Sequence, residues 1–81
     1  MIQEKYYDFT VIFFPAKEGG FTVSVPALPG CFTEGDFLEE AQKNAKDAIK
    51  TYIESLRMDG EEIPAENNEF ISRIRINAIP A

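Results

Sequence analysis

The chain has 81 residues and a formal net charge of −6, which predicts one domain over residues 1–81 and disfavours direct binding to nucleic-acid phosphate. A lone cysteine excludes an internal disulfide, and the core of so small a domain stabilises it only weakly, so we expect self-association as a homodimer or a larger homo-oligomer. The sequence has neither a secretory signal nor an apolar run of the roughly 20 residues that span a bilayer, so we expect a cytoplasmic protein without membrane contact.

Two strands joined by a glycine-containing turn are predicted near the N-terminus. Residues 5–14 are dense in aromatic and β-branched types and alternate in polarity, and residues 21–25 alternate in the same way. The outer face of the first strand remains apolar through Tyr6, Ile12 and Phe14. These three side chains are therefore candidates for a dimer interface.

A short third strand and one long helix are predicted next. Residues 31–34 follow a Pro-Gly turn, and Asp36 stands where a helix N-cap is expected, with Glu39 three residues later as in a capping box. From Phe37 to about Met58, apolar residues recur at steps of three and four and mark one buried stripe. Gly60 is well placed as the residue just past the end of this helix.

An acidic loop and a last strand complete the pattern. The loop covers residues 59–69, and its carboxylates suit a basic partner surface, although a solvated loop without a partner has equal weight. Residues 70–79 alternate as in a strand. The fold class is therefore α+β, with a small three- to four-stranded, mainly antiparallel sheet packed on one long helix in the order β-β-β-α-β. The candidate partner-binding residues of the loop are Glu61, Glu62, Glu66 and Glu69.

The segment from Gly19 to Ala41 closely resembles the HicB antitoxin family. In that family a hairpin strand leads into a Leu-Pro-Gly-Cys turn, and a Thr-X-Gly-Asp step then opens a helix with Leu-Glu-Glu-Ala. The resemblance continues along the helix and covers at least Tyr6 to Leu56. The matching residues are Leu28, Pro29, Gly30, Cys31, Thr33, Gly35, Asp36, Leu38, Glu39, Glu40 and Ala41, followed by Asn44, Ala45, Ala48 and Ile49.

The resemblance implies a partly degraded ribonuclease H-like domain and a protein partner. That partner is a HicA-like toxin, a small basic protein that cleaves mRNA, and the antitoxin neutralises it by masking its active surface. Longer family members add a C-terminal DNA-binding segment, whereas only a few residues follow the last predicted strand here. The sequence is therefore interpreted as a short form that does not bind DNA directly.

Two alternatives remain open beside this interpretation. One is an orphan module of the same family, which serves as a structural or regulatory interaction protein without a toxin. The other is a metal-dependent nuclease with Asp8 and Glu40 as ligands, but the last strand offers Arg73 and Arg75 where a third carboxylate is needed. Cys31 lacks a histidine partner, since the chain contains no histidine. We therefore expect no enzyme activity, no metal and no cofactor.

Overall fold

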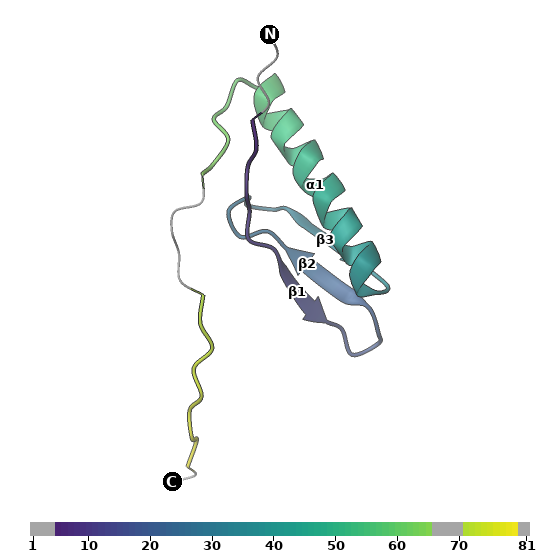
Figure 1. Ribbon diagram of the computed structural model, residues 1–81, viewed down its shortest axis with the longest axis vertical. Helices are drawn as coiled ribbons and strands as arrows, with labels where there is room; N and C mark the ends of the chain where they lie inside the picture. The colour runs from purple at the N-terminus through teal and green to yellow at the C-terminus, as the bar shows by residue number, and fades with distance from the viewer. Residues whose placement is uncertain (1–4, 66–70, 80–81) are drawn as a thin grey trace.

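One long helix packs on a three-stranded antiparallel sheet in this α+β fold. The computed structural model describes residues 5–65 and 71–79. The strands are β1 (Ile12–Pro15), β2 (Phe21–Ser24) and β3 (Phe32–Gly35), and they are followed by the helix α1 (Leu38–Met58) (Figure 1). The helix packs mainly over β3 and β2, so the core lies in one layer between helix and sheet.

The sheet has the order β1-β2-β3, with β2 in the centre. β1 pairs with β2 from Ile12 opposite Ser24, and β2 pairs with β3 from Phe21 opposite Gly35. The predicted hairpin is thus confirmed, but the first strand is much shorter than predicted. Residues 5–11 carry no strand assignment, because β2 ends before Pro26, which has no N–H group to extend the ladder.

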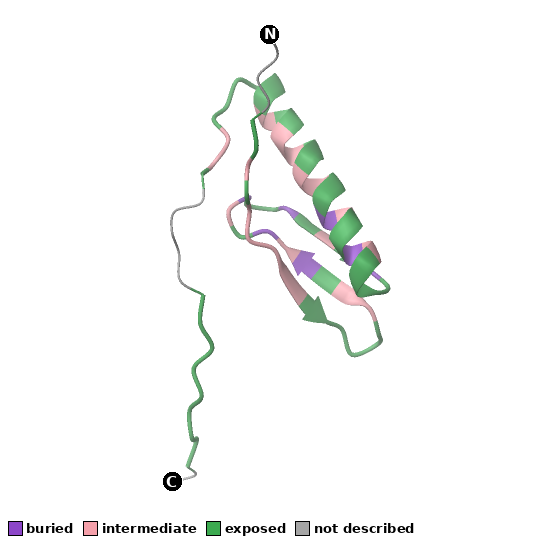
Figure 2. Cartoon of the chain, viewed as in Figure 1, coloured by how far each residue is buried: buried purple, intermediate pink, exposed green. Residues whose placement is uncertain are grey.

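The core consists of two small clusters that meet along the helix. Val23 packs with Ala41 and Ala45, where small helix residues let α1 approach the sheet (Figure 2). The second cluster contains Leu28 and Cys31 of the turn before β3, together with Val25. Cys31 is therefore a buried apolar residue, as predicted.

The helix begins one residue later than predicted. Its N-cap is Phe37, which is extended and makes no side-chain cap hydrogen bond, and Phe37 O accepts the first helical bond from Ala41 N. The carboxylate of Glu40 instead accepts a hydrogen bond of 2.8 Å from Asp36 N. The prediction of Asp36 as N-cap with Glu39 as its partner is therefore wrong, because the back-bonding carboxylate belongs to Glu40, three residues after the true cap.

The helix ends as predicted, in a turn that requires glycine. Gly60 has a φ of +70° and donates to Arg57 O, while Glu61 N donates to Leu56 O at 2.8 Å. These two bonds satisfy the last carbonyls of the helix in a Schellman motif. Within the ranges 5–65 and 71–79, no helix combines the length and the apolar character needed to cross a membrane.

The strand predicted over residues 70–79 is not formed in its described part. Residues 71–79 have no strand assignment and are all exposed, whereas Phe70 lies outside the described residues. In Figure 1 this segment runs away from the sheet. The alternating pattern alone cannot make a strand, because a strand needs a neighbouring backbone to receive its hydrogen bonds.

Candidate functional site

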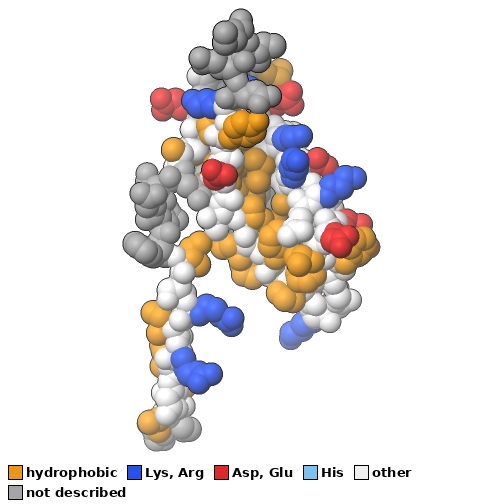
Figure 3. Space-filling model, viewed as in Figure 1, with side chains coloured by type: hydrophobic (Ala, Val, Ile, Leu, Met, Phe, Trp, Pro, Cys, Tyr) orange, Lys and Arg blue, Asp and Glu red, His pale blue; other side chains and the backbone are white. Residues whose placement is uncertain are grey.

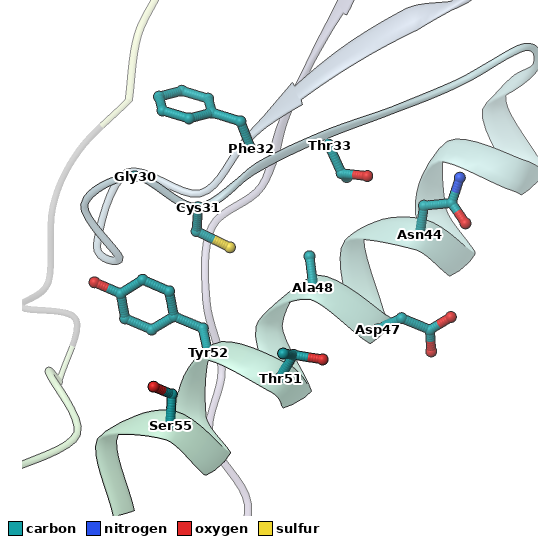
Figure 4. A pocket seen from close by; sticks show the side chains of 10 residues that line it. All are labelled: Gly30, Cys31, Phe32, Thr33, Asn44, Asp47, Ala48, Thr51, Tyr52 and Ser55. Atoms are coloured by element: carbon teal, nitrogen blue, oxygen red, sulfur yellow. The ribbon is translucent and has the colours of Figure 1, made fainter. Parts of the chain in front are cut away.

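An open groove of about 570 Å³ lies between β3 and α1 (Figure 4). One wall is the end of the turn before β3 together with the start of that strand, and the other wall is one side of the helix. The groove is open along its length, whereas a pocket for a small molecule usually encloses most of the ligand. Its shape therefore suits a segment of another protein better. Its lining residues are Gly30, Cys31, Phe32, Thr33, Asn44, Asp47, Ala48, Thr51, Tyr52 and Ser55.

Two side-chain hydrogen bonds from the helix hold the strand wall of this groove in place. Asn44 Nδ2 donates to Glu34 O at 2.8 Å, and Tyr52 Oη donates to Pro29 O at 2.9 Å. The first bond fixes β3, and the second fixes the turn that leads into it. Because both bonds join the two walls directly, the groove is formed before any partner arrives, which lowers the entropic cost of binding.

The strand wall offers a backbone edge and one large apolar side chain. β3 is an edge strand of the described sheet, so the backbone groups that neither pair with β2 nor, like Glu34 O, accept a bond from Asn44 can pair with another chain. Phe32 is 70% exposed at the lip of the groove and extends from β3 away from the helix (Figure 4). An exposed aromatic side chain beside a free strand edge is typical of a protein-binding surface.

The helix wall of the groove is largely polar. Asp47, Thr51 and Ser55 are exposed along it and can exchange hydrogen bonds with a partner. Burial raises the pKa of the Cys31 thiol, which disfavours the thiolate that a nucleophile needs. Among the described residues, no three His, Cys, Asp or Glu side chains gather where they could hold a metal ion.

Of the acidic residues predicted to bind a partner, the two that the structure describes lie outside the groove beside β3. Glu61 and Glu62 are exposed directly after α1 and border a surface hollow with Lys5 and Tyr7, not the groove beside β3. Glu66 and Glu69 lie outside the described residues.

The three residues predicted for a dimer interface are not all equally exposed. Tyr6 is 81% exposed and Phe14 is 51% exposed, whereas Ile12 is half-buried. The sheet register places Ile12, Ser24 and Phe32 in one row across the three strands. Ile12 therefore shares the outer face of the sheet with the exposed Phe32.

The sequence analysis did not identify the groove itself. The polar residues of its helix wall are spaced three and four positions apart, as on one side of a helix. They are Asn44, Asp47, Thr51 and Ser55. In the sequence alone, this spacing of polar residues looks like any solvated helix face. Only the position of β3 beside that face, fixed by the bond from Asn44 to Glu34 O, turns it into the wall of a groove.

Comparison with known proteins gives a consistent result over most of the chain. A family model described as the HicB-like antitoxin of bacterial toxin–antitoxin systems matches residues 9–76. A UPF0150 protein of Thermoplasma acidophilum is 50% identical over 64 residues, which are 79% of this chain and 93% of that protein.

Two relatives named as antitoxins are longer than this chain. Antitoxin HicB 1 of Photorhabdus laumondii is 46% identical over 50 residues, which are 62% of this chain and 32% of the relative. Antitoxin HicB of Escherichia coli K12 is 39% identical over 56 residues, which are 69% of this chain and 41% of the relative. The chain thus spans less than half of each of these antitoxins.

Proposed function

Because this chain belongs to the HicB-like antitoxin family of bacterial toxin–antitoxin systems, we propose that it neutralises a HicA-like toxin by masking the surface with which that toxin cleaves mRNA. The observation that carries the proposal is the family match over residues 9–76, which includes the whole unit from β1 to α1. The antitoxin relatives also suggest a regulatory protein that binds rather than catalyses. Its site of action is the cytoplasm, where mRNA is found.

The groove beside β3 supports this proposal as the docking surface for the toxin. A partner strand can pair with the backbone groups of β3 that neither β2 nor Asn44 occupies, while Phe32 supplies an apolar anchor and Thr51 and Ser55 supply polar contacts. The two bonds between the groove walls keep this surface in one shape.

Charge supports the same class of partner. The chain has a net charge of −6, and Asp47 in the groove and Glu61 and Glu62 after the helix are exposed carboxylates. A toxin that binds RNA needs a basic surface, which an acidic protein attracts over several ångströms before contact. The attraction raises the association rate and favours basic partners over acidic ones.

The test is inhibition of mRNA cleavage by a HicA-like toxin. The wild-type protein should abolish cleavage at a saturating, fixed stoichiometry. Thr51→Lys places a positive charge in the groove and should weaken inhibition at least about tenfold, since one uncompensated charge in an interface costs more than 1.4 kcal/mol. Gln42→Lys adds the same charge to an exposed position on the other side of α1 and should weaken it much less.

Two results would contradict the proposal in different ways. Unchanged cleavage in the presence of excess protein would exclude neutralisation and favour an orphan interaction module. Equal losses from Thr51→Lys and Gln42→Lys would retain the antitoxin role but exclude the groove beside β3 as its docking surface.

A further inference from the structure

The register of the sheet determines which backbone groups of β3 face outward. Val25 N donates to Cys31 O at 3.2 Å, so these two residues face each other across the ladder as a hydrogen-bonded pair. Hydrogen-bonded and non-hydrogen-bonded pairs alternate along an antiparallel ladder. Thr33, two residues after Cys31, is therefore bonded to β2, whereas Phe32 and Glu34 direct their N–H and C=O groups away from it.

Two side chains of α1 close this outer edge at the end of β3. Asn44 Nδ2 donates to Glu34 O at 2.8 Å. The next residue of the same alternation is Asp36, and its N–H donates to a carboxylate oxygen of Glu40 at 2.8 Å. In the described part of the chain, the outer edge of β3 therefore offers three backbone groups to a partner, which are Phe32 N–H, Phe32 O and Glu34 N–H.

These three groups fit a very short partner strand in one register. In the antiparallel arrangement, which is the commoner and slightly more stable one, one partner residue exchanges both backbone bonds with Phe32. The carbonyl two residues earlier in the partner accepts from Glu34 N. The N–H of that earlier residue would point at Glu34 O, which Asn44 already occupies. Proline avoids this conflict, because it has no backbone N–H.

The two faces of β3 determine which side chains suit the positions after the proline. Phe32 is 70% exposed on the outer face, so the partner residue paired with it gains most if it is apolar. Thr33 lies on the other face, because its neighbour Val23 packs against α1. The partner residue beside Thr33 therefore faces the helix wall, where Asp47 is exposed less than one turn after Asn44. A basic residue suits this position.

We propose that β3 receives a toxin segment with the sequence proline, basic residue, apolar residue, in antiparallel direction, and that Asn44 sets its register. The apolar residue pairs with Phe32, and the proline lies opposite Glu34. This inference rests on the proposed function, since it specifies the part of the toxin that the groove beside β3 binds. Asn44 then acts as a specificity-determining residue in addition to fixing β3.

The second groove, on the other side of α1, does not suit such a segment. It has a volume of about 840 Å³ and lies between residues 5–13 and the helix, where hydrophobic side chains gather in Figure 3. The charged residues of its lining are Lys5, Asp8, Lys46 and Lys50. With three lysines against one aspartate it repels a basic segment, whereas Asp47 in the groove beside β3 attracts one.

The first test follows single amides of the full chain by NMR hydrogen exchange, with and without a saturating HicA-like toxin. In the free protein the N–H groups of Thr33 and Gly35 should exchange slowly, and those of Phe32 and Glu34 rapidly. The toxin should slow Phe32 and Glu34 at least about tenfold more than Thr33. Slow exchange of Phe32 and Glu34 in the free protein, or unchanged exchange in the complex, would overturn the proposal.

The second test uses Asn44→Ala, with Tyr52→Phe as the matched loss of the other bond between the groove walls. Asn44→Ala leaves Glu34 O without a partner in the complex, so the dissociation constant for the toxin should rise at least about fivefold, and more than for Tyr52→Phe. Tighter binding of Asn44→Ala would show that the partner strand continues past Glu34 and would overturn the proposal.

A substitution in the toxin separates a specific role of Asn44 from a structural one. The toxin amides that become protected identify the bound segment, and replacing its proline with alanine should weaken binding to the wild type at least about fivefold. Asn44→Ala should remove most of this loss, because Glu34 O can then accept the new N–H. Equal losses in both proteins, or a bound segment without the proline, would overturn this inference while inhibition of cleavage upholds the antitoxin role. A toxin that is neither bound nor inhibited would overturn both.

Discussion

At the scale of single residues, the close contact between β3 and the start of α1 leaves no room for a side chain at Gly35. Gly35 is buried, and a Cβ atom placed on it would lie 2.5 Å from the backbone nitrogen of Ala41. Gly35→Ala should therefore push the helix away from β3 and lower the free energy of unfolding by roughly 1–3 kcal/mol, measured by urea denaturation. Glu34→Ala, at the exposed neighbouring position, should change it by less than about 0.5 kcal/mol.

A second residue-scale prediction concerns the buried thiol of Cys31. Burial raises its pKa above the ordinary value of 9.0. The thiol therefore loses its proton in the unfolded chain first as the pH rises. The contribution of Cys31 to the free energy of unfolding is complete below pH 9.0, and it is lost as the pH passes through the folded-state pKa. The stability difference between the wild type and Cys31→Ala, measured by urea unfolding, should shrink between pH 8 and pH 10. A constant difference would contradict this account.

At the scale of elements, the sequence predicted the hairpin, the short third strand and the long helix because each carries its own local signal. The Schellman turn at Gly60 was predictable for the same reason. The shortened β1 was not, because its length depends on where β2 ends, at Ser24 before Pro26. The groove beside β3 was equally hidden, since it exists only where a polar helix face meets an edge strand.

The start of α1 gives the element-scale prediction. The carboxylate of Glu40 accepts the hydrogen bond from Asp36 N, which ties the chain entering the helix to its first turn. Glu40→Gln replaces the charged acceptor with a weaker neutral one. It should lower the free energy of unfolding, measured by thermal denaturation, by about 0.5–1 kcal/mol. Glu39→Gln removes the same charge from the same turn without altering this bond, and it should cost clearly less. Equal losses would assign the effect to the helix dipole alone.

At the scale of the whole molecule, the net charge of −6 governs how the protein meets a basic partner. If the proposed function holds, stopped-flow measurements should show the association rate with a HicA-like toxin falling at least tenfold between about 20 mM and 500 mM salt, because screening shortens the reach of the attraction. The dissociation rate should change far less. Glu61→Gln with Glu62→Gln should flatten the salt dependence if these carboxylates contribute to steering, and leave it unchanged if they are only solvated.

The helix α1 forms one wall of the groove beside β3, through Asn44, Thr51 and Ser55. Its other side lines a second groove, against residues 5–13, through Ala45, Ile49 and Ile53. A ligand in either groove therefore contacts the same helix. If filling one groove shifts α1 even slightly, the affinity of the other must change, and thermodynamic reciprocity makes the two effects equal in free energy. Binding of the proposed toxin in the groove beside β3 would then be linked to the binding of any ligand in the second groove, so each ligand would change the affinity of the other.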